Sequence, residues 1–328
     1  MAYRGDVYGS SIVPKNSLRS HTHVSTMKIR CFFAAGYRWM RAFTVFATII
    51  SATETALAAS PVRFSSTPIP GMTRAEWVVV MHADPVAVMV LAPGCNGDGE
   101  TMVKDIGWLS FAQKQRLILV GLSFASDIRA LHDGTGYYYA AKGSGTLLLN
   151  ALDRLTHKPL PILMYGFSGG AHVTARFAEW KPERVAAWCA YSAGWWDDPL
   201  PSARMMPLGM IACGEDDMRL GASLFYFKKG RAVGRPWLWA GIPGDGHVEN
   251  GRFRAFARAY FAAVLEKMQA PDRPRGVWVD IEEKTLAEDG LSISQPSVTG
   301  WLPDMKLFPA WKALAGDMTG GKAAENPE

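Results

Sequence analysis

The sequence predicts an α/β protein with a mainly parallel central sheet and helices on both of its faces. Short apolar runs alternate along the 328 residues with longer segments whose apolar side chains recur at helical spacing. The short runs are continuously apolar, which is typical of strands that are covered on both faces. A third observation is Gly166-Phe167-Ser168-Gly169-Gly170, which stands where one apolar run gives way to an amphipathic segment.

The first two strands are expected at 75–82 and 86–91, because both stretches are apolar and rich in β-branched residues. Ala83-Asp84-Pro85 separates them with turn residues, so the pair is predicted to be a hairpin that enters the sheet. The elements expected next are a helix over 99–115, a strand over 117–122, a helix over 146–155, a strand over 160–165, a helix over 171–180, strands over 185–191 and 207–213, a helix over 220–229, a strand over 237–242 and a helix over 249–268.

The charge of the chain is concentrated near its start. The formal net charge is +5, and residues 1–58 hold seven Lys or Arg against two Asp or Glu. The remaining residues carry 28 basic and 28 acidic side chains. This balance removes the electrostatic reason to expect nucleic acid or an anionic membrane as a partner.

Residues 1–58 have the pattern of a leader that ends in a secretory signal peptide. Basic residues between 28 and 41 precede an apolar stretch over 42–50, and Ala56-Leu57-Ala58 gives a small-x-small cleavage pattern. The apolar stretch is too short to span a bilayer, although an uncleaved anchor is the alternative. We expect cleavage after Ala58 or one residue later and an exported, periplasmic or extracellular protein. The first segment also fits an over-long start, with the true start near Met27 or Met40.

Two further regions follow the leader. Residues 59–270 are predicted to form the main domain, and the Pro-rich and charged stretch over 270–276 marks its end. Residues 271–328 contain a candidate strand at 277–281 and a short helix at 309–314. This appendage is too small to hold a core of its own, so we expect it to pack on the main domain and to end in a frayed tail.

Three cysteines remain after the leader: Cys95, Cys189 and Cys213. An odd number leaves at least one thiol without an intramolecular partner. Cys189 and Cys213 fall in successive predicted strands, so a bridge between them is one possibility, and three small buried apolar residues are the other.

The glycine-flanked Ser168 has the sequence form of a nucleophile elbow. A serine on so sharp a bend is forced outward at the positive end of the helix that follows it. A hydroxyl becomes a useful nucleophile when a histidine takes its proton and an acid orients that histidine. At a strand-to-helix turn of this type, the acid and then the histidine follow the serine in chain order.

His247 is the candidate base. Of the five histidines after the leader, it alone lies well beyond the elbow, in the Gly-rich loop between the last strand and the last helix of the main domain. The acid is expected in Glu215-Asp216-Asp217, directly after a predicted strand. Asp217 is preferred and Asp216 stays open, while Asp197 and Asp198 are weaker alternatives.

Acyl transfer also needs hydrogen-bond donors for a developing oxyanion. The backbone N–H of Gly169, directly after the serine, is one candidate. The loop from Ala92 to Gly99 follows an earlier strand and contains three glycines, so its backbone can supply the second. Cys95 is assigned to this role, with Asn96 close behind, although such a loop can also be a simple strand-to-helix turn.

Further histidine, tryptophan and tyrosine residues are candidates for a role near Ser168. His172 lies four residues after Ser168 and is predicted to be a semi-buried, hydrogen-bonded histidine that points away from the hydroxyl. Trp195 and Trp196 follow a strand at its carboxyl end, where open α/β sheets bind ligands, so both are candidate substrate-binding residues. The Tyr137-Tyr138-Tyr139 run is a weaker candidate. Metal, phosphate and dinucleotide motifs do not occur in the sequence, so no cofactor is expected.

These motifs together resemble the α/β-hydrolase superfamily, and within it the secreted esterases related to polyhydroxyalkanoate depolymerases and feruloyl esterases. The resemblance covers roughly residues 75–268 and depends on Pro93-Gly94-Cys95, the Gly166 to Gly170 elbow, the Gly214 to Asp217 loop and Gly246-His247. Those esterases commonly carry a histidine where Pro93 stands here.

The resemblance implies an exported serine hydrolase that cleaves a small or polymeric carboxylic ester through an acyl-enzyme, with Ser168, His247 and Asp217 as the catalytic triad. The alternatives are a peptidase of the same fold and a non-catalytic binding protein that keeps the hydrolase fold. No nucleic-acid partner and no stable membrane insertion after cleavage are expected, and the oligomeric state stays open.

Overall fold

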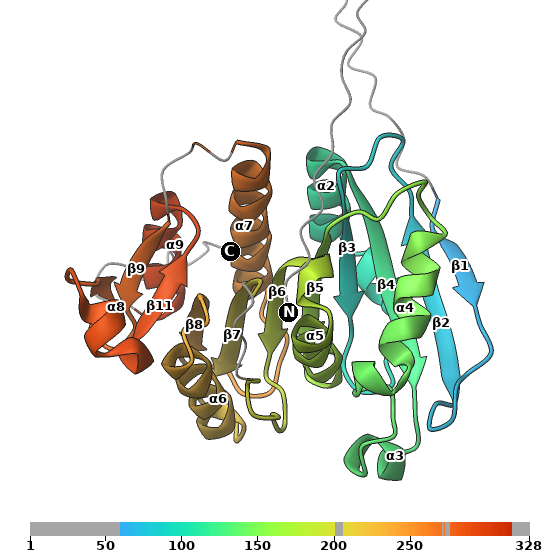
Figure 1. Ribbon diagram of the computed structural model, residues 1–328, viewed down its shortest axis with the longest axis horizontal. Helices are drawn as coiled ribbons and strands as arrows, with labels where there is room; N and C mark the ends of the chain where they lie inside the picture. Colours follow the sequence, from blue (N-terminus) through green and yellow to red (C-terminus); the bar gives the residue numbers. More distant parts are fainter. Residues whose placement is uncertain (1–59, 201–205, 271, 273–275, 317–328) are drawn as a thin grey trace, which may run out of the picture. The chain divides into compact units, whose positions relative to one another are not determined.

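Eight strands form one sheet in the computed structural model, which describes residues 60–200, 206–270, 272 and 276–316. The order across the sheet is β1-β2-β4-β3-β5-β6-β7-β8 (Figure 1). Its strands are β1 (Val62–Ser65), β2 (Arg74–Val80), β3 (Ala87–Ala92), β4 (Leu117–Ala125), β5 (Ile162–Phe167), β6 (Val185–Tyr191), β7 (Leu208–Gly214) and β8 (Trp237–Ile242). The strands from β4 to β8 in this order run parallel, and β2 and β1 continue the sheet with antiparallel pairings. The predicted mainly parallel sheet is confirmed.

The predicted leader and frayed tail lie outside the described residues, as does most of the stretch over 270–276 that marks the predicted domain boundary. Among the residues that the structure does describe, no helix combines the length and the apolar character that crossing a bilayer requires.

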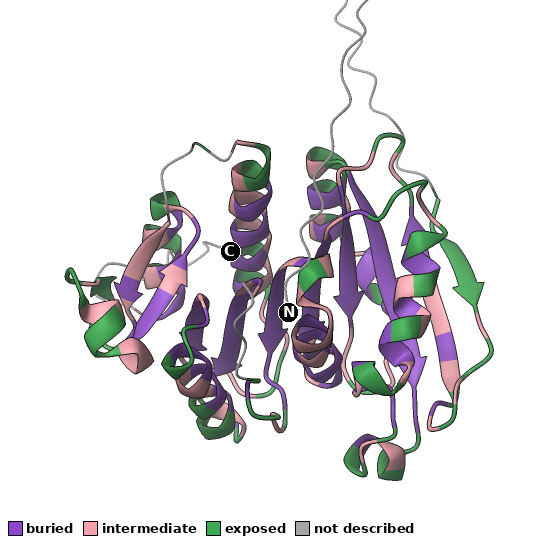
Figure 2. Cartoon of the chain, in the orientation of Figure 1, coloured by how far each residue is buried: buried purple, intermediate pink, exposed green. Residues whose placement is uncertain are grey.

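Helices connect the strands. They are α1 (Gly99–Val103), α2 (Ile106–Gln115), α3 (Ile128–His132), α4 (Ser144–Asp153), α5 (Gly169–Trp180), α6 (Leu220–Ala232) and α7 (Gly251–Gln269), with short 3-10 turns η1 (Ala140–Lys142) and η2 (Pro182–Arg184). Every residue of β3, β4 and β8 is buried, so helices cover both faces of the sheet. Figure 2 shows this burial along the central strands, whereas the edge strand β1 is exposed.

The helix predicted over 99–115 is two helices. The carboxylate of Asp105 accepts a hydrogen bond from the Trp108 N–H and caps the start of α2, so the helix is interrupted between α1 and α2. An Asp at this position competes with helix continuation because its side chain replaces a backbone acceptor.

The hairpin predicted for the first two strands is wrong. β2 pairs antiparallel with β4, and β4 pairs parallel with β3, so β4 lies between the two strands that were expected to pair. All six residues of β3 are buried, which is typical of a strand inside a parallel sheet, whereas a tight hairpin would pair it antiparallel with β2. β3 instead pairs parallel with β4 and β5.

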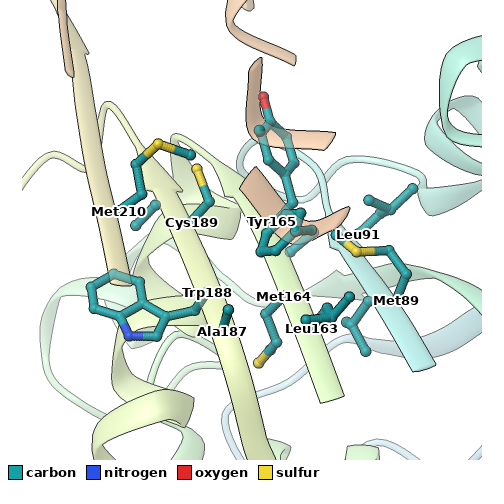
Figure 3. Packing of buried hydrophobic residues seen from close by; sticks show 14 of the residues in the cluster. Met89, Leu91, Leu163, Met164, Tyr165, Ala187, Trp188, Cys189 and Met210 are labelled. Carbon is teal, nitrogen blue, oxygen red and sulfur yellow. The ribbon is translucent and has the colours of Figure 1, made fainter. Parts of the chain in front are cut away.

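The core lies between the sheet and the helices. Met89 of β3, Met164 of β5, Trp188 of β6 and Met210 of β7 are fully or almost fully buried (Figure 3). The register places Met164 and Trp188 on one face of the sheet and Met89 and Met210 on the other, so both faces are packed. Cys189 belongs to this core, and it and Cys213 are buried free thiols. The bridge considered between them is therefore not formed. Cys95 is exposed, so only two of the three thiols are core residues.

Residues 276–316 form a small second sheet. Its strands are β9 (Val277–Asp280), β10 (Thr285–Leu286) and β11 (Thr299–Leu302), in the order β10-β9-β11. The same segment contains α8 (Leu291–Ser294), α9 (Phe308–Leu314) and the 3-10 turns η3 (Pro296–Val298) and η4 (Met305–Leu307).

Trp311 and Arg231 are buried side chains that join this segment to β8 and α6. The indole N–H of Trp311, in α9, donates to the Trp239 carbonyl of β8 at 2.8 Å, and the indole is buried. The guanidinium of Arg231, in α6, donates to the Thr299 carbonyl at 2.8 Å and lies 4.1 Å from the ring centre of Trp278. Burial lowers the pKa of Arg231 to about 10. The segment therefore shares its core with β8 and α6.

Replacing the buried Trp311 with alanine should lower the free energy of unfolding by about 3–5 kcal/mol, because it leaves a cavity and an unpaired carbonyl under α9. Denaturant unfolding followed by fluorescence measures the change. Ile293→Ala is the control, since Ile293 of α8 is 86% exposed and its loss should change stability by less than about 0.5 kcal/mol. A Trp311→Ala protein as stable as this control would show that the segment does not contribute to the common core.

Candidate active site

Ser168 stands on a strained bend between β5 and α5. Its backbone has φ 51° and ψ −113°, a conformation that residues other than glycine rarely adopt. The bend is possible because glycines flank it: a Cβ on Gly166 would lie 2.2 Å from the Gly170 carbonyl oxygen, and one on Gly170 would lie 1.9 Å from that of Ala92. The Ser168 N–H donates to the Tyr191 carbonyl at 2.8 Å. The bend therefore holds the serine at the carboxyl end of the parallel strands.

His247 reaches Ser168 from the loop between β8 and α7. The distance between its Nε2 and the Ser168 Oγ is 2.9 Å. Phe167 stacks on the imidazole with ring centres 5.0 Å apart and 25° between the ring planes. The loop is held against the loop after β7, since the Asp216 N–H donates to the Asp245 carbonyl at 2.9 Å. The imidazole is thus fixed on one side by a ring and at both nitrogens by hydrogen-bond partners.

Asp217 is the acid that contacts the histidine. Its Oδ2 lies 2.7 Å from His247 Nδ1, and its side chain is fully buried. Its Oδ1 accepts from the Arg219 backbone N–H at 3.1 Å and from the Arg219 guanidinium at 2.9 Å. Asp216, the open alternative, is exposed. The weaker candidates Asp197 and Asp198 form ion pairs with Arg176 and Lys229 instead.

The partners of Asp217 determine its charge state. Burial of the carboxyl raises its pKa, but hydrogen bonds from His247, Arg219 and Ser192 outweigh burial and hold the pKa at about 2. An ionised Asp217 is an acceptor for an N–H at Nδ1 of His247, and the other ring nitrogen, Nε2, faces the Ser168 hydroxyl. The three side chains therefore form one hydrogen-bonded series from Ser168 through His247 to Asp217.

The loop after β3 contacts the elbow. Gly97 donates its N–H to the Gly94 carbonyl at 2.9 Å, which closes a turn with Cys95 and Asn96 at its centre. The Asn96 N–H donates to the Tyr137 hydroxyl at 3.0 Å and is therefore engaged. A Cβ on Gly169 would lie 2.6 Å from the backbone N of Cys95. The backbones of Gly169 and Cys95 are thus in contact, and these are the two residues assigned as oxyanion donors.

Gly169 is the first residue of α5, and the first N–H groups of a helix have no acceptor within it. Together with the positive end of the helix dipole, a free N–H at this position stabilises negative charge beside Ser168.

Trp195 belongs to an aromatic cluster beside this site. Its ring centre lies 4.1 Å from that of His172, 4.8 Å from His132 and 5.7 Å from Tyr138. The Tyr138 hydroxyl in turn lies against Gly169, since a Cβ on Gly169 would lie 2.7 Å from it. The cluster therefore connects Trp195 to the residue that follows the nucleophile.

His172 is buried within this cluster and hydrogen-bonded. Its Nε2 accepts the Gly194 N–H at 3.1 Å, and its Nδ1 lies 3.1 Å from an Arg176 guanidinium nitrogen. Burial, followed by the nearby Arg176, lowers its pKa well below the ordinary value. His172 is therefore neutral and holds the loop that carries Trp195.

Trp196 points into a different environment. It stacks on Tyr226 with ring centres 4.3 Å apart and 12° between the planes, and it lines an apolar cavity of about 230 Å³ between α5, α6 and η1. Tyr139 and Trp180 line the same cavity, whereas Ser168 does not. The two adjacent tryptophans thus lie in different environments. The three tyrosines also differ in what they contact: Tyr137 bonds the loop after β3, Tyr138 lies against Gly169, and Tyr139 lines this cavity, although the rings of Tyr137 and Tyr138 touch each other.

Phe167 and Arg219 were not identified from the sequence. Phe167 lies between Gly166 and Ser168 in the elbow pattern, and Arg219 lies two positions after Asp217. Neither position in the sequence predicts that Phe167 stacks on His247 or that Arg219 binds Asp217. Within the described ranges, no three His, Cys, Asp or Glu side chains are grouped so that they could hold a metal ion.

The strand order and the elbow after β5 define the α/β-hydrolase fold. No family model matches the sequence, and no curated protein sequence matches it either. Solved structures that are similar to it include the fluorophosphonate-binding serine hydrolase F of Staphylococcus aureus, at 15% identity over 63% of this chain and 99% of that one, with a TM-score of 0.48. A ferulic acid esterase is similar at 12% identity over 64% and 98% of the two chains, with a TM-score of 0.48. Poly(aspartic acid) hydrolase-1 of Sphingomonas sp. KT-1 is similar at 14% identity over 63% and 98%, with a TM-score of 0.45.

Asp217 should make the stability of the protein depend on pH in the acid range. Its pKa is about 2 in the folded chain and 3.8 in its ordinary state, so between these values the unfolded chain binds a proton that the folded chain does not. The stabilisation by Asp217 is thus complete when the pH is above the ordinary pKa of 3.8, and it is lost as the pH falls through the folded-state pKa of about 2.

Urea unfolding of the native protein and of Asp217→Asn, measured between about pH 6 and pH 2, tests this expectation. The difference in free energy of unfolding should shrink toward the acid end. Asp216→Asn, which removes a carboxylate of the same loop that is not bound to His247, is the control. A difference that stays constant over the whole range would contradict the prediction.

Proposed function

We propose that this protein is a serine hydrolase that cleaves carboxylic esters through an acyl-enzyme. The observation that carries the proposal is the continuous hydrogen-bonded series from the Ser168 Oγ through His247 to Asp217, with distances of 2.9 and 2.7 Å. The contact between the backbones of Gly169 and Cys95 beside the same serine supports it.

In the first half of the reaction, the Ser168 Oγ attacks the carbonyl carbon of the ester while His247 Nε2 takes the hydroxyl proton. The imidazolium that forms is stabilised by ionised Asp217. The carbonyl oxygen becomes an oxyanion that accepts hydrogen bonds from the N–H groups of Gly169 and Cys95. When this intermediate collapses, the bond to the alcohol oxygen breaks, and His247 returns its proton to the leaving alcohol.

In the second half, a water molecule attacks the acyl carbon and gives its proton to His247. The second tetrahedral intermediate collapses, the bond to Ser168 Oγ breaks, and the proton on His247 restores the serine hydroxyl. The acid product leaves, and the site returns to its starting protonation. The proton transfers and the oxyanion contacts of both halves use five residues: Ser168, His247, Asp217, Gly169 and Cys95.

Trp195 is proposed to contact the acyl group of the substrate. Its indole is only partly buried, and the cluster with Tyr138 and His172 holds it beside the residue that follows the nucleophile. A rigid aromatic surface next to the reacting carbonyl favours acyl groups that are themselves aromatic or long and apolar. Export remains a prediction of the leader, because residues 1–59 lie outside the described part of the chain.

Ser168→Ala should lower kcat/KM for a p-nitrophenyl ester by a factor on the order of 10⁴ or more, since the nucleophile is lost while the fold is kept. Initial rates and labelling by a fluorophosphonate probe measure the effect, and the native protein should carry the probe on Ser168. Ser294→Ala, at an exposed position in α8, is the control. A p-nitroanilide with the same acyl group measures the preference for esters over amides. Faster turnover of the anilide would indicate that the protein is a peptidase and not an esterase. Full activity of Ser168→Ala would refute the serine mechanism altogether.

Trp195→Ala should lower kcat/KM for aromatic acyl esters roughly tenfold relative to the acetyl ester, because the aromatic contact with the acyl group is lost. A series of p-nitrophenyl esters that differ only in the acyl group gives this ratio. Trp196→Ala is the matched control, since the neighbouring indole lines the cavity beside α6 and should leave the ratio unchanged. Equal ratios for both variants would remove Trp195 from the substrate site.

A further inference from the structure

Arg74, at the start of β2, binds the loop that follows β3. One guanidinium nitrogen, Nη2, donates to the carbonyls of Asn96 and Gly97 at 2.7 and 2.6 Å, and Nε donates to the Ser123 carbonyl of β4 at 3.0 Å. These acceptors are all backbone carbonyls. A charged donor makes stronger hydrogen bonds than a neutral one, so this half-buried cation ties the loop to both β2 and β4.

The loop needs such a tie because of its composition. Gly94, Gly97 and Gly99 give it more conformational freedom than other residues would, and this freedom is lost when the loop adopts one structure. Asn96 also has a positive φ of 55°. An oxyanion hole works when its donors are already oriented before charge develops. A glycine-rich loop supplies close backbone approach, but it does not supply rigidity.

The contacts of Arg74 reach the proposed oxyanion donor through two peptide groups. Arg74 holds the carbonyl of Asn96, which shares one planar peptide group with the Gly97 N–H, and that N–H donates to the Gly94 carbonyl at 2.9 Å. The Gly94 carbonyl and the Cys95 N–H belong to one planar, trans peptide group, so the direction of one sets the direction of the other. Fixing the Asn96 carbonyl therefore restrains the direction in which the Cys95 N–H points.

Other contacts at the loop act on different groups. The Asn96 side chain exchanges two hydrogen bonds with the backbone of Ser126, and its N–H donates to Tyr137. These contacts hold the centre of the turn. The carbonyl side of the turn, at Asn96 and Gly97, is held by Arg74.

We propose that Arg74 is a positioning residue for the oxyanion hole: by binding the Asn96 and Gly97 carbonyls it orients the Cys95 N–H toward the oxyanion formed at Ser168. The proposal rests on the proposed function of the site. It assigns to Arg74 no contact with substrate and no part in proton transfer.

Three variants test the assignment. Arg74→Met removes the donors and keeps the aliphatic part of the side chain, and Arg74→Lys keeps a charge that can reach fewer carbonyls. Arg184→Met is the matched control, because Arg184 bonds Asp153 at 2.7 Å near the start of β6, at the end of the strand away from the serine. Circular dichroism confirms that each variant is folded. Should Arg74→Met not fold, Arg74→Lys and Arg74→Gln carry the same measurements.

Kinetics with a p-nitrophenyl ester separate positioning from binding. We expect Arg74→Met to lower kcat between tenfold and a hundredfold with KM changed less than about threefold, because the loss falls on the transition state. A trifluoromethyl ketone, to which the Ser168 oxygen adds to give an oxyanion, should bind more weakly by the same factor as kcat/KM falls. Arg74→Lys should recover part of the loss, and Arg184→Met should stay within twofold of the native protein. A kcat within twofold of native for Arg74→Met, or a loss confined to KM, would overturn the proposal.

Amide hydrogen exchange at residues 94–98 tests the restraint on the loop without any reaction. Exchange should be faster in Arg74→Met and unchanged in Arg184→Met. Unchanged exchange in Arg74→Met would overturn the restraint and with it the proposal. A native protein with no ester hydrolysis and no probe on Ser168 would instead refute the proposed function, and faster exchange would then still identify Arg74 as the residue that restrains the loop.

Discussion

Close contact between backbones at the elbow is the constraint on which the site depends. Gly170 lies against the Ala92 carbonyl, Gly166 against Gly170, and Gly169 against Cys95, each too close to admit a Cβ. These contacts bring the end of β3 and the end of β5 together at the start of α5. The same approach leaves Ser168 in a strained backbone conformation, next to the close contact between Gly169 and Cys95. A side chain larger than hydrogen at Gly166, Gly169 or Gly170 would separate the nucleophile from its proposed oxyanion donors.

The parallel sheet explains why residues distant in sequence meet there. The loops after β3, β5, β7 and β8 all leave the same edge of the sheet, and they carry Cys95, Ser168, Asp217 and His247. Each group is then fixed by contacts between loops. Asp217 shows the consequence, because one carboxylate oxygen binds Arg219 and the other binds His247. The guanidinium of Arg219, from the same loop as Asp217, thus stabilises the negative charge of the carboxylate that binds His247.

The sequence predicted most elements of the fold but not how all of them pair. Apolar runs and helical spacing are local properties, and they located the strands from β2 to β8 and the main helices. Strand pairing depends on partners elsewhere in the chain, so the expected hairpin was wrong: β4, which begins at Leu117, lies between β2 and β3. The single helix expected over 99–115 was divided by Asp105, whose capping bond competes with helix continuation.

The identity of Ser168 and His247 as candidates was determined by the sequence alone, because the elbow pattern is local and His247 is the one histidine well beyond it. The structure decided between neighbours that the sequence could not separate. Asp217 and not Asp216 reaches His247, and the Asn96 N–H is engaged by Tyr137 while Cys95 lies against Gly169. It also revealed Arg74, which lies 22 positions before Asn96, whose carbonyl it binds. These choices depend on hydrogen bonds between segments far apart in the chain, and local patterns contain no information about which distant donor will meet which carbonyl.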